Sequence, residues 1–242
     1  MSARVLKNCK LYFGGHNLSG DVNKMTLDYS VEMLEATTFS DDSKRRVAGL
    51  FDVSADHEGY FQAGTAPKLV DDILFEKLAL ADQVMTVCPT TGAAGEIAYT
   101  TKAVEAEYSP GAAVGELFAF SVSAQGTERL VRATVMQNGA LTVSGDGIAR
   151  QLGAVTADQK MYAVVHVIAA SGTTPTLDIA IESDNAEAFL SGIERVTFDQ
   201  FTDVGAQWKE LSGAITDDWW KPVFTAGGTN PSFTVIVLLG IM

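Results

Sequence analysis

Hydrophobic and polar residues alternate along most of this chain with a period of two, the pattern of β-strands that bury one face. The alternating segments are rich in β-branched and aromatic residues, and glycine, proline and asparagine separate them. In the first part of the chain they are residues 24–39, 96–108, 115–124 and 130–137. The pattern therefore predicts a mainly-β protein.

One segment, residues 66–81, has a helical pattern instead. Its apolar side chains fall on one face of a helix, at Leu69, Val70, Ile73, Leu74 and Leu78. Pro67 suits the first turn of a helix and Thr65 suits the position that caps it. We expect one α-helix over residues 66–81, flanking the β core.

Beyond residue 137, glycine and small residues dominate until a second series of strands begins. The expected strands are residues 161–170, 176–183, 194–201, 207–211, 219–225 and 232–241. Their spacing of about ten residues, with turn-forming residues between them, is typical of a β-sandwich or jelly roll. We expect a core domain over residues 1–147 and a C-terminal β-sandwich domain over residues 148–242.

The composition and charge limit the classes of function that this chain is expected to have. With 17 Lys+Arg and 30 Asp+Glu among 242 residues, the net charge is −13, so broad binding to DNA is not expected. Charged residues make up only 19% of the chain, below the usual ~25%, which indicates that other subunits cover part of the surface. No segment resembles a membrane span or a secretory signal. We expect a chain made in a cytosol, with Cys9 and Cys88 as reduced thiols.

Little in the sequence indicates catalysis. The three histidines are His16 in a glycine-rich turn, His57 beside acidic residues and His166 in an apolar strand, and each is expected to be packed or solvated. The glycine-rich segments lack the lysine of a phosphate-binding loop, and no zinc or calcium ligand spacing occurs. We expect no metal, no cofactor and no enzymatic activity.

A charged stretch, SDDSKRRVAG over residues 40–49, stands out between two strand-like segments. It predicts a long hairpin with a charged tip, formed by Asp41, Asp42, Lys44, Arg45 and Arg46. Two interpretations stay open: a flexible solvated loop, or an arm that docks on a charged partner surface.

The chain has three tryptophans, Trp208, Trp219 and Trp220, all in its distal part. Packing in the core of a sandwich explains them, and so does an exterior surface that stacks on sugars or contacts another protein.

The order of these elements resembles the tail tube (major tail) proteins of long-tailed bacteriophages. The segment from Leu18 to Tyr60 carries most of the likeness, with ATTF, the RR pair and the strand DVSADHEGYF as its most specific parts. The resemblance covers residues 1 to about 145. The distal part, with TLDIAIESD, GAQWKEL and GGTNPSFTVIVLLGI, is similar to the extra β domain of tube proteins of the actinobacteriophage type.

The resemblance implies a β-sandwich or barrel core with one flanking helix, in hexameric rings that stack into the tail tube of the virion. Double-stranded DNA would pass through the lumen without specific binding, and the partners would be further copies, the tape measure, the terminator and the tail tip. Assembly would take place in the host cytoplasm, with no membrane involved. In that family the long hairpin reaches the adjacent ring, a role that would fall here on Asp41, Asp42, Lys44, Arg45 and Arg46.

The charge is compatible with this role, because an acidic wall does not trap the phosphate backbone. Since like-charged subunits repel one another, assembly would have to come from apolar burial and from paired sheet edges. Two other classes remain as alternatives: another virion shell or decoration protein, and a carbohydrate-binding β-sandwich module.

Overall fold

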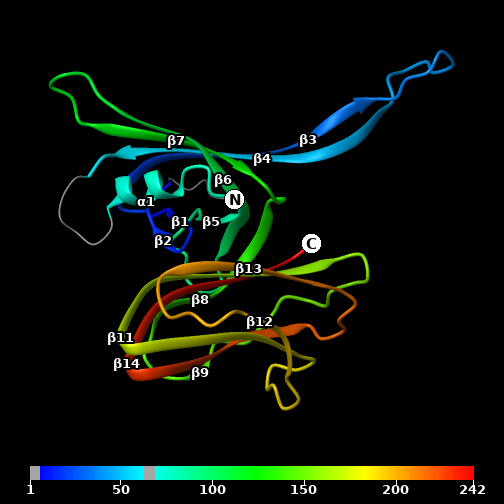
Figure 1. Cartoon of the computed structure of the whole chain (residues 1–242). Helices are drawn as coiled ribbons and strands as arrows, with labels where there is room; N and C mark the ends of the chain where they lie inside the picture. The colour runs from blue at the N-terminus through cyan, green and yellow to red at the C-terminus, as the bar shows by residue number, and fades with distance from the viewer. Residues whose placement is uncertain (1–5, 63–68) are drawn as a thin grey trace. The chain divides into compact units, whose positions relative to one another are not determined.

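The computed structural model describes residues 6–62 and 69–242, and in them the chain is mainly β, as predicted (Figure 1). The strands are β1 Lys10–Phe13, β2 His16–Asn17, β3 Val22–Glu35, β4 Arg46–Tyr60, β5 Gln83–Cys88, β6 Ile97–Gly111, β7 Ala119–Gly126, β8 Val131–Leu141, β9 Gly145–Asp146, β10 Arg150–Gln151, β11 Lys160–Asp184, β12 Ile193–Thr197, β13 Gly205–Ser212 and β14 Trp219–Ile241. The helix α1 spans Val70–Lys77. The described strand pairs are antiparallel.

The chain folds into two compact units, each made of segments that are distant in sequence. The large unit comprises the described residues within Met1–Gly20, Gln83–Thr100 and Val131–Met242. The hairpin unit comprises those within Asp21–Asp82 and Thr101–Leu130. Strand β6 contributes to both, because residues 97–100 pair with β8 and residues 103–111 pair with β7.

The large unit is organised by the pairing of its two longest strands, β11 and β14, which are in register from Met161↔Ile241 to Asp184↔Trp219. The first part of β11 is buried on both faces. Met161, Ala163 and Val165 belong to one apolar cluster, whereas Tyr162 and Val164 belong to another. Burial on both faces explains why this segment is a continuous apolar run instead of an alternating one.

The hairpin unit contains a sheet in the order β3-β4-β7-β6. Every second residue of β4 from Val53 to Gly59 is buried, and so is every second residue of β7 from Phe120 to Ala124. The sheet therefore has one apolar and one polar face, as period-two patterning requires. Helix α1 also belongs to this unit and buries Val70, Ile73 and Leu74.

The helix is shorter than the predicted 66–81. Residues 66–68, and with them Pro67 and the cap Thr65, lie outside the described residues. At the other end the helix stops at Lys77, Leu78 forms a bridge with Glu105, and Ala79 has a φ of 61°. A positive φ is incompatible with a continuing right-handed helix, so the apolar spacing alone overextended the prediction.

No described helix has the length and apolarity that crossing a membrane requires.

In the distal part of the chain, the two longest strands each combine two segments that the sequence pattern predicted as separate strands. The segments predicted separately at 161–170 and 176–183 belong to one strand, β11, and those at 219–225 and 232–241 belong to β14. Irregularities in the β11–β14 register between Ser171 and Thr176 accommodate the glycine and proline that suggested turns.

The two compact units also differ from the domains predicted on either side of residue 147. The glycine-rich stretch after residue 137 resembles a linker in sequence, yet its short strands β9 and β10 pair with β14. Strand β8 lies before that boundary and pairs with β14 beyond it, from Phe233↔Leu141 to Leu239↔Thr134. The fragment 1–147 would therefore lose a neighbour of β8.

Replacing Trp220 by alanine should lower the free energy of unfolding by about 3–5 kcal/mol, because the side chain is 0% exposed within the larger apolar cluster. The control is Trp208→Ala, since Trp208 is only partly buried. Urea denaturation followed by far-ultraviolet circular dichroism measures both variants. Equal losses would mean that burial does not distinguish the two tryptophans.

Candidate functional site

The polar face of the β3-β4-β7-β6 sheet is rich in carboxylates. Thr26 pairs with Asp56 and Asp28 with Ser54 across β3 and β4, and Asp56 pairs with Ser123 on β7. The residues on this face include Lys24, Thr26, Asp28, Asp52, Ser54, Asp56, Glu58, Glu107, Ser109, Ser121 and Ser123. Lys24 forms an ion pair with Glu58, which leaves the face strongly negative.

The hairpin of β3 and β4 extends beyond this sheet as an arm, defined here as residues 30–52. Strand β7 pairs with β4 only from Ser54 to Tyr60, so β3 and β4 continue with no other described strand beside them (Figure 1). Residues 46–52 alone extend roughly 20 Å at the rise of an antiparallel strand. The predicted long hairpin is therefore confirmed.

The arm exposes large apolar side chains as well as charges. Its exposed large apolar residues are Met33, Leu34, Phe39, Val47, Leu50 and Phe51. At the base, Tyr29 stacks on Phe51 with ring centroids 5.4 Å apart, and the Arg129 guanidinium lies 4.7 Å from the Phe51 ring centroid. Apolar surface of this extent on an isolated hairpin is typical of a segment that packs against another protein.

All five residues predicted for a contact loop lie in the arm, and the structure separates their roles. Asp41 accepts hydrogen bonds from the backbone N and Oγ1 of Thr38, at 2.8 and 3.0 Å, and so shapes the turn. Lys44 forms an ion pair with Glu35 at 3.0 Å.

The side chains of Asp42, Arg45 and Arg46 are exposed, and no ion pair of theirs is found among residues 6–62 and 69–242. The backbone N of Arg45 donates to Thr37 Oγ1 at 3.1 Å, which fixes its position in the tip. Asp42, Arg45 and Arg46 are thus the charges of the tip most available to a partner.

The sheet of the hairpin unit has two edges without a full complement of strands. Among the described residues β3 pairs only with β4 along its whole length. On the other side, residues 107–111 of β6 have β7 as their only partner strand within residues 6–62 and 69–242, beyond the bridge between Leu78 and Glu105. Each edge presents backbone N–H and C=O groups to which another strand could pair.

Two ionisable residues are buried on the apolar face of this sheet. Glu105 is 0% exposed, and neither of its carboxyl oxygens has a hydrogen-bond partner in the described part of the chain. Burial raises its pKa to about 8, so the carboxyl is neutral at pH 7. His57 is also buried without a described partner, and burial lowers its pKa to about 4.

His166 lies in the large unit and is hydrogen-bonded, as expected for a packed histidine. Its Nε2 is 2.9 Å from Thr86 Oγ1, and burial lowers its pKa to about 3. No three His, Cys, Asp or Glu side chains of residues 6–62 and 69–242 come together in the way a metal site requires.

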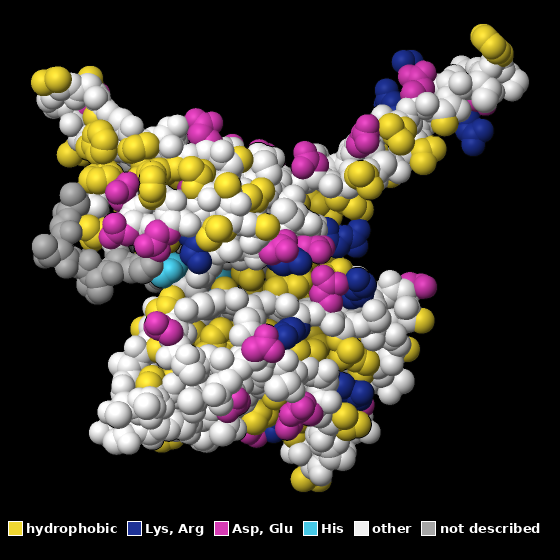
Figure 2. All heavy atoms as spheres, viewed as in Figure 1, with side chains coloured by type: hydrophobic (Ala, Val, Ile, Leu, Met, Phe, Trp, Pro, Cys, Tyr) yellow, Lys and Arg dark blue, Asp and Glu magenta, His cyan; other side chains and the backbone are white. Residues whose placement is uncertain are grey.

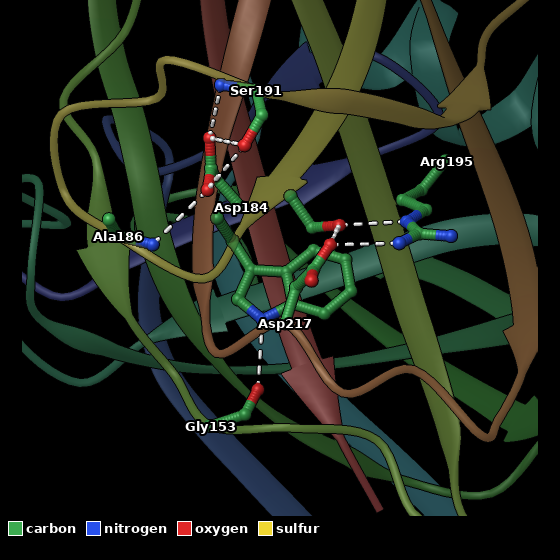
Figure 3. Close-up of polar contacts among 8 residues, drawn as sticks. Gly153, Asp184, Ala186, Ser191, Arg195 and Asp217 are labelled. Atoms are coloured by element: carbon green, nitrogen blue, oxygen red, sulfur yellow. Dashed lines mark hydrogen bonds and ion pairs between the residues drawn. The ribbon is translucent and has the colours of Figure 1, made fainter.

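A polar network in the large unit contains the residue types of a functional site, but its side chains bond to one another and to the backbone (Figure 3). Arg195 donates from Nε to Ser183 Oγ at 2.7 Å and from Nη2 to Asp217 Oδ2 at 2.8 Å. The hydrogen bonds from Ser183 and Arg195 hold the pKa of Asp217 below its usual range. Next to it, Asp184 accepts from the backbone N of Ser191 at 2.9 Å. These contacts tie β11, β12 and two loops together.

The three tryptophans do not form a common exposed surface. Trp220 is fully buried and donates from Nε1 to the Gly153 carbonyl at 2.9 Å, so it is a core residue and not an exterior contact. Trp219 and Trp208 are partly buried, and Trp208 packs edge-on against Tyr162.

Sequence reasoning missed the exposed apolar residues of the arm and the buried Glu105. In residues 29–35 and 47–51, apolar residues occur at both odd and even positions, so both faces of these strands carry them. A strand with one buried face would carry apolar residues at every second position only, and this difference was the signal for the arm. The signal for Glu105 was an acidic residue in the buried register of β6, between Ala103 and Tyr108.

The sequence matches no protein-family model and no curated protein. Among solved structures, the chain is similar to a component of the virion of a native gene transfer agent particle, with a TM-score of 0.42 and 10% identity over 54% of this chain and 98% of that chain. It is also similar to two chains of an extracellular contractile injection system in the extended state. For its sheath/tube terminator the TM-score is 0.44 and the identity 12%, over 55% and 97% of the two chains. For its sheath–tube complex the values are 0.41 and 12%, over 53% and 89%.

The stability of the protein should fall as the pH rises from 6.5 to 8, because of Glu105. Over most of this range the unfolded chain carries Glu105 ionised, whereas most of the folded protein keeps the proton, since burial raises the pKa from 4.5 to about 8. The folded state then binds more protons, and stability decreases with pH. His57 contributes only below pH 6.5, its ordinary pKa.

The variant Glu105→Gln should remove most of this slope, and urea denaturation at several pH values measures it. Glu107→Gln, an exposed glutamate on the same strand, is the matched control. An unchanged slope in Glu105→Gln would show that Glu105 is not the group responsible.

Proposed function

We propose that this chain is a structural virion protein that polymerises as stacked hexameric rings into a phage tail tube, the conduit for genome delivery. The observation that carries the proposal is the sheet of the hairpin unit: it has two open edges, one acidic face and a protruding arm. The hexameric ring and the tail-tube family are inferred from the resemblance of residues 1 to about 145 to tail tube proteins.

The two edges of this sheet belong to different strands, β3 and β6. Pairing the β3 edge of one copy with the β6 edge of the next is a heterologous contact, and such contacts close into rings when the rotation permits. Closure also removes the unpaired edges, which are otherwise sites of uncontrolled aggregation. Ring formation therefore satisfies the backbone groups that the single chain leaves open.

The two faces of the sheet give such a ring an inside and an outside. The apolar face holds buried residues such as Val53, Ala55 and Val122, and the helix α1 buries its own apolar residues within the same unit. The polar face carries Asp28, Asp56 and other carboxylates and would line the bore. An acidic bore repels the phosphate backbone, so DNA slides without being held.

The arm would extend from one ring to the next. It carries exposed apolar residues and the exposed cations Arg45 and Arg46, which suits an interface better than a bore. We further propose that residues 148–242 lie on the tube exterior, that the other partners are the tape measure, terminator and tail tip, and that assembly takes place in the host cytoplasm.

A carbohydrate-binding module is the less favoured alternative, because the fully buried Trp220 cannot belong to an exposed aromatic platform. Another type of virion shell or decoration protein shares the β-rich, acidic character, and electron microscopy distinguishes it, since only a tube protein forms stacked rings with a central channel.

The charge reversal Arg45→Glu with Arg46→Glu should leave the chain folded and abolish tubes in electron micrographs. Exposed charges contribute little to the stability of the chain itself, whereas reversed charges at an interface repel the partner. The control reverses Lys7 and Arg132, two exposed cations of the large unit, for the same change in net charge. Normal tubes from the arm variant would exclude the arm from assembly, and a wild-type chain that forms no rings or tubes would contradict the proposed function.

Wild-type tubes should bind duplex DNA negligibly at physiological salt, and Asp28→Lys with Asp56→Lys should create binding that weakens steeply between roughly 50 and 200 mM salt. Both substitutions place cations on the face proposed to line the bore. Fluorescence anisotropy of a short labelled duplex measures the affinity. The control, Asp158→Lys with Asp203→Lys, changes exposed residues of the large unit. Equal binding by the control would argue against this face as the bore.

A further inference from the structure

Along the strand direction, the sheet of the hairpin unit has a chain turn at each end. Strand β7 starts beside the end of β4, with Ala119 opposite Tyr60, and it reaches Gln125 opposite Ser54. The β6–β7 turn, residues 112–118, therefore lies at the end of the sheet away from the tip of the arm (Figure 1). One end of the unit projects as the arm, and the other end presents this turn.

The β6–β7 turn exposes apolar side chains. Val114 and Leu117 are 108% and 73% exposed, and hydrophobic side chains are visible at both ends of the unit (Figure 2). At the base of the turn, Phe118 packs edge-on against Phe61 with ring centroids 4.9 Å apart, and the backbone N of Phe61 donates to the Phe118 carbonyl at 3.0 Å. The turn is anchored at its base and apolar at its surface.

The two ends differ in charge, and the tip of the arm carries Asp41 and Asp42 as well as cations. Glu116 is the one charged residue of residues 112–118. The tip of the arm carries three consecutive cations, Lys44, Arg45 and Arg46, in a chain whose net charge is −13. Because Lys44 pairs with Glu35 and Asp41 accepts from Thr38, the charges left for a partner are Asp42, Arg45 and Arg46. Phe39, in the same tip, is fully exposed and supplies an apolar contact.

A stack of copies requires one of the two ways in which the arm tips could make contact. Contact between two arm tips would be a two-fold contact that closes with one pair of copies and does not propagate. Contact of a tip with a β6–β7 turn brings Arg45 or Arg46 to Glu116 and Phe39 to Val114 and Leu117. This head-to-tail contact leaves a free tip and a free turn on the pair, so it propagates as a stack.

We propose that the β6–β7 turn of one copy, residues 112–118, is the surface that receives the arm tip of a second copy of this chain. The inference rests on the proposed function, because it names the receiving surface of the stacking contact.

A charge exchange tests the contact between Arg45 and Glu116. Glu116→Arg and Arg45→Glu, each alone, should raise the protein concentration needed for tubes at least tenfold, and the two together should return it to near the wild-type value. Sedimentation and electron microscopy measure tube formation, and circular dichroism confirms that each variant is folded. Normal tubes from Glu116→Arg, or a double variant no better than either single variant, would overturn the inference.

Cross-linking gives a readout that does not depend on the energy of one ion pair. In assembled tubes of Phe39→Cys with Val114→Cys, mild oxidation should link successive copies into a ladder of multimers on a non-reducing gel. Each single variant controls for Cys9 and Cys88. Phe39→Cys with Leu190→Cys is the matched control, since Leu190 is 92% exposed but lies in the large unit.

The outcomes separate the inference from the function on which it rests. Wild-type tubes without a ladder from Phe39→Cys with Val114→Cys would overturn the receiving surface and leave the tube intact. A ladder of equal strength from the Leu190 pair would do the same. A wild-type chain that forms no tubes would overturn both.

Discussion

Unsatisfied sheet edges are the constraint on which the hairpin unit depends. Strand β3 has fourteen residues, and its only described neighbour is β4, so one side of a long strand presents backbone groups to solvent. Soluble proteins usually shorten, cover or distort such edges because they aggregate. Here the outer face of the edge carries Lys24 and Asp28, and the opposite side of the sheet offers a second open edge on β6. In the proposed ring, the β3 edge of one copy would pair with the β6 edge of the next, so each contact would remove one open edge of either kind.

Both units bury polar groups, and in each unit some of these groups have described partners and others do not. In the large unit, Arg195, Ser183 and Asp217 satisfy one another within 2.8 Å. In the hairpin unit, Glu105 and His57 are buried without described partners and must be neutral, which costs stability whenever the unfolded chain would carry the charge. Burial likewise lowers the pKa of His166 in the large unit to about 3, whereas the raised pKa of the buried carboxyl belongs to Glu105 in the hairpin unit.

The chain also divides its apolar residues between a core and an exposed surface. The large unit buries its apolar residues in two clusters around β11 and β14. The arm leaves Met33, Leu50 and Phe51 open to solvent, although an isolated two-stranded hairpin has little to stabilise it in water. Burial of these side chains against another subunit would stabilise the arm and the assembly together, so in the proposed tube the two stabilities would be coupled.

The amino-acid sequence by itself determined the mainly-β class, the position of the helix near Val70–Lys77, the hairpin around residues 40–49 and the packed role of His166, because each depends on periodicity or composition within a short window. Tertiary structure decided the rest. Only long-range pairing joins segments on either side of Pro231 into β14, sets residues 131–141 beside it and buries Trp220. The site divides in the same way: local sequence marked the charged tip, whereas strand register decided which carboxylates share a face and which edges stay open. Register depends on partners far away along the chain, and a local pattern does not contain them.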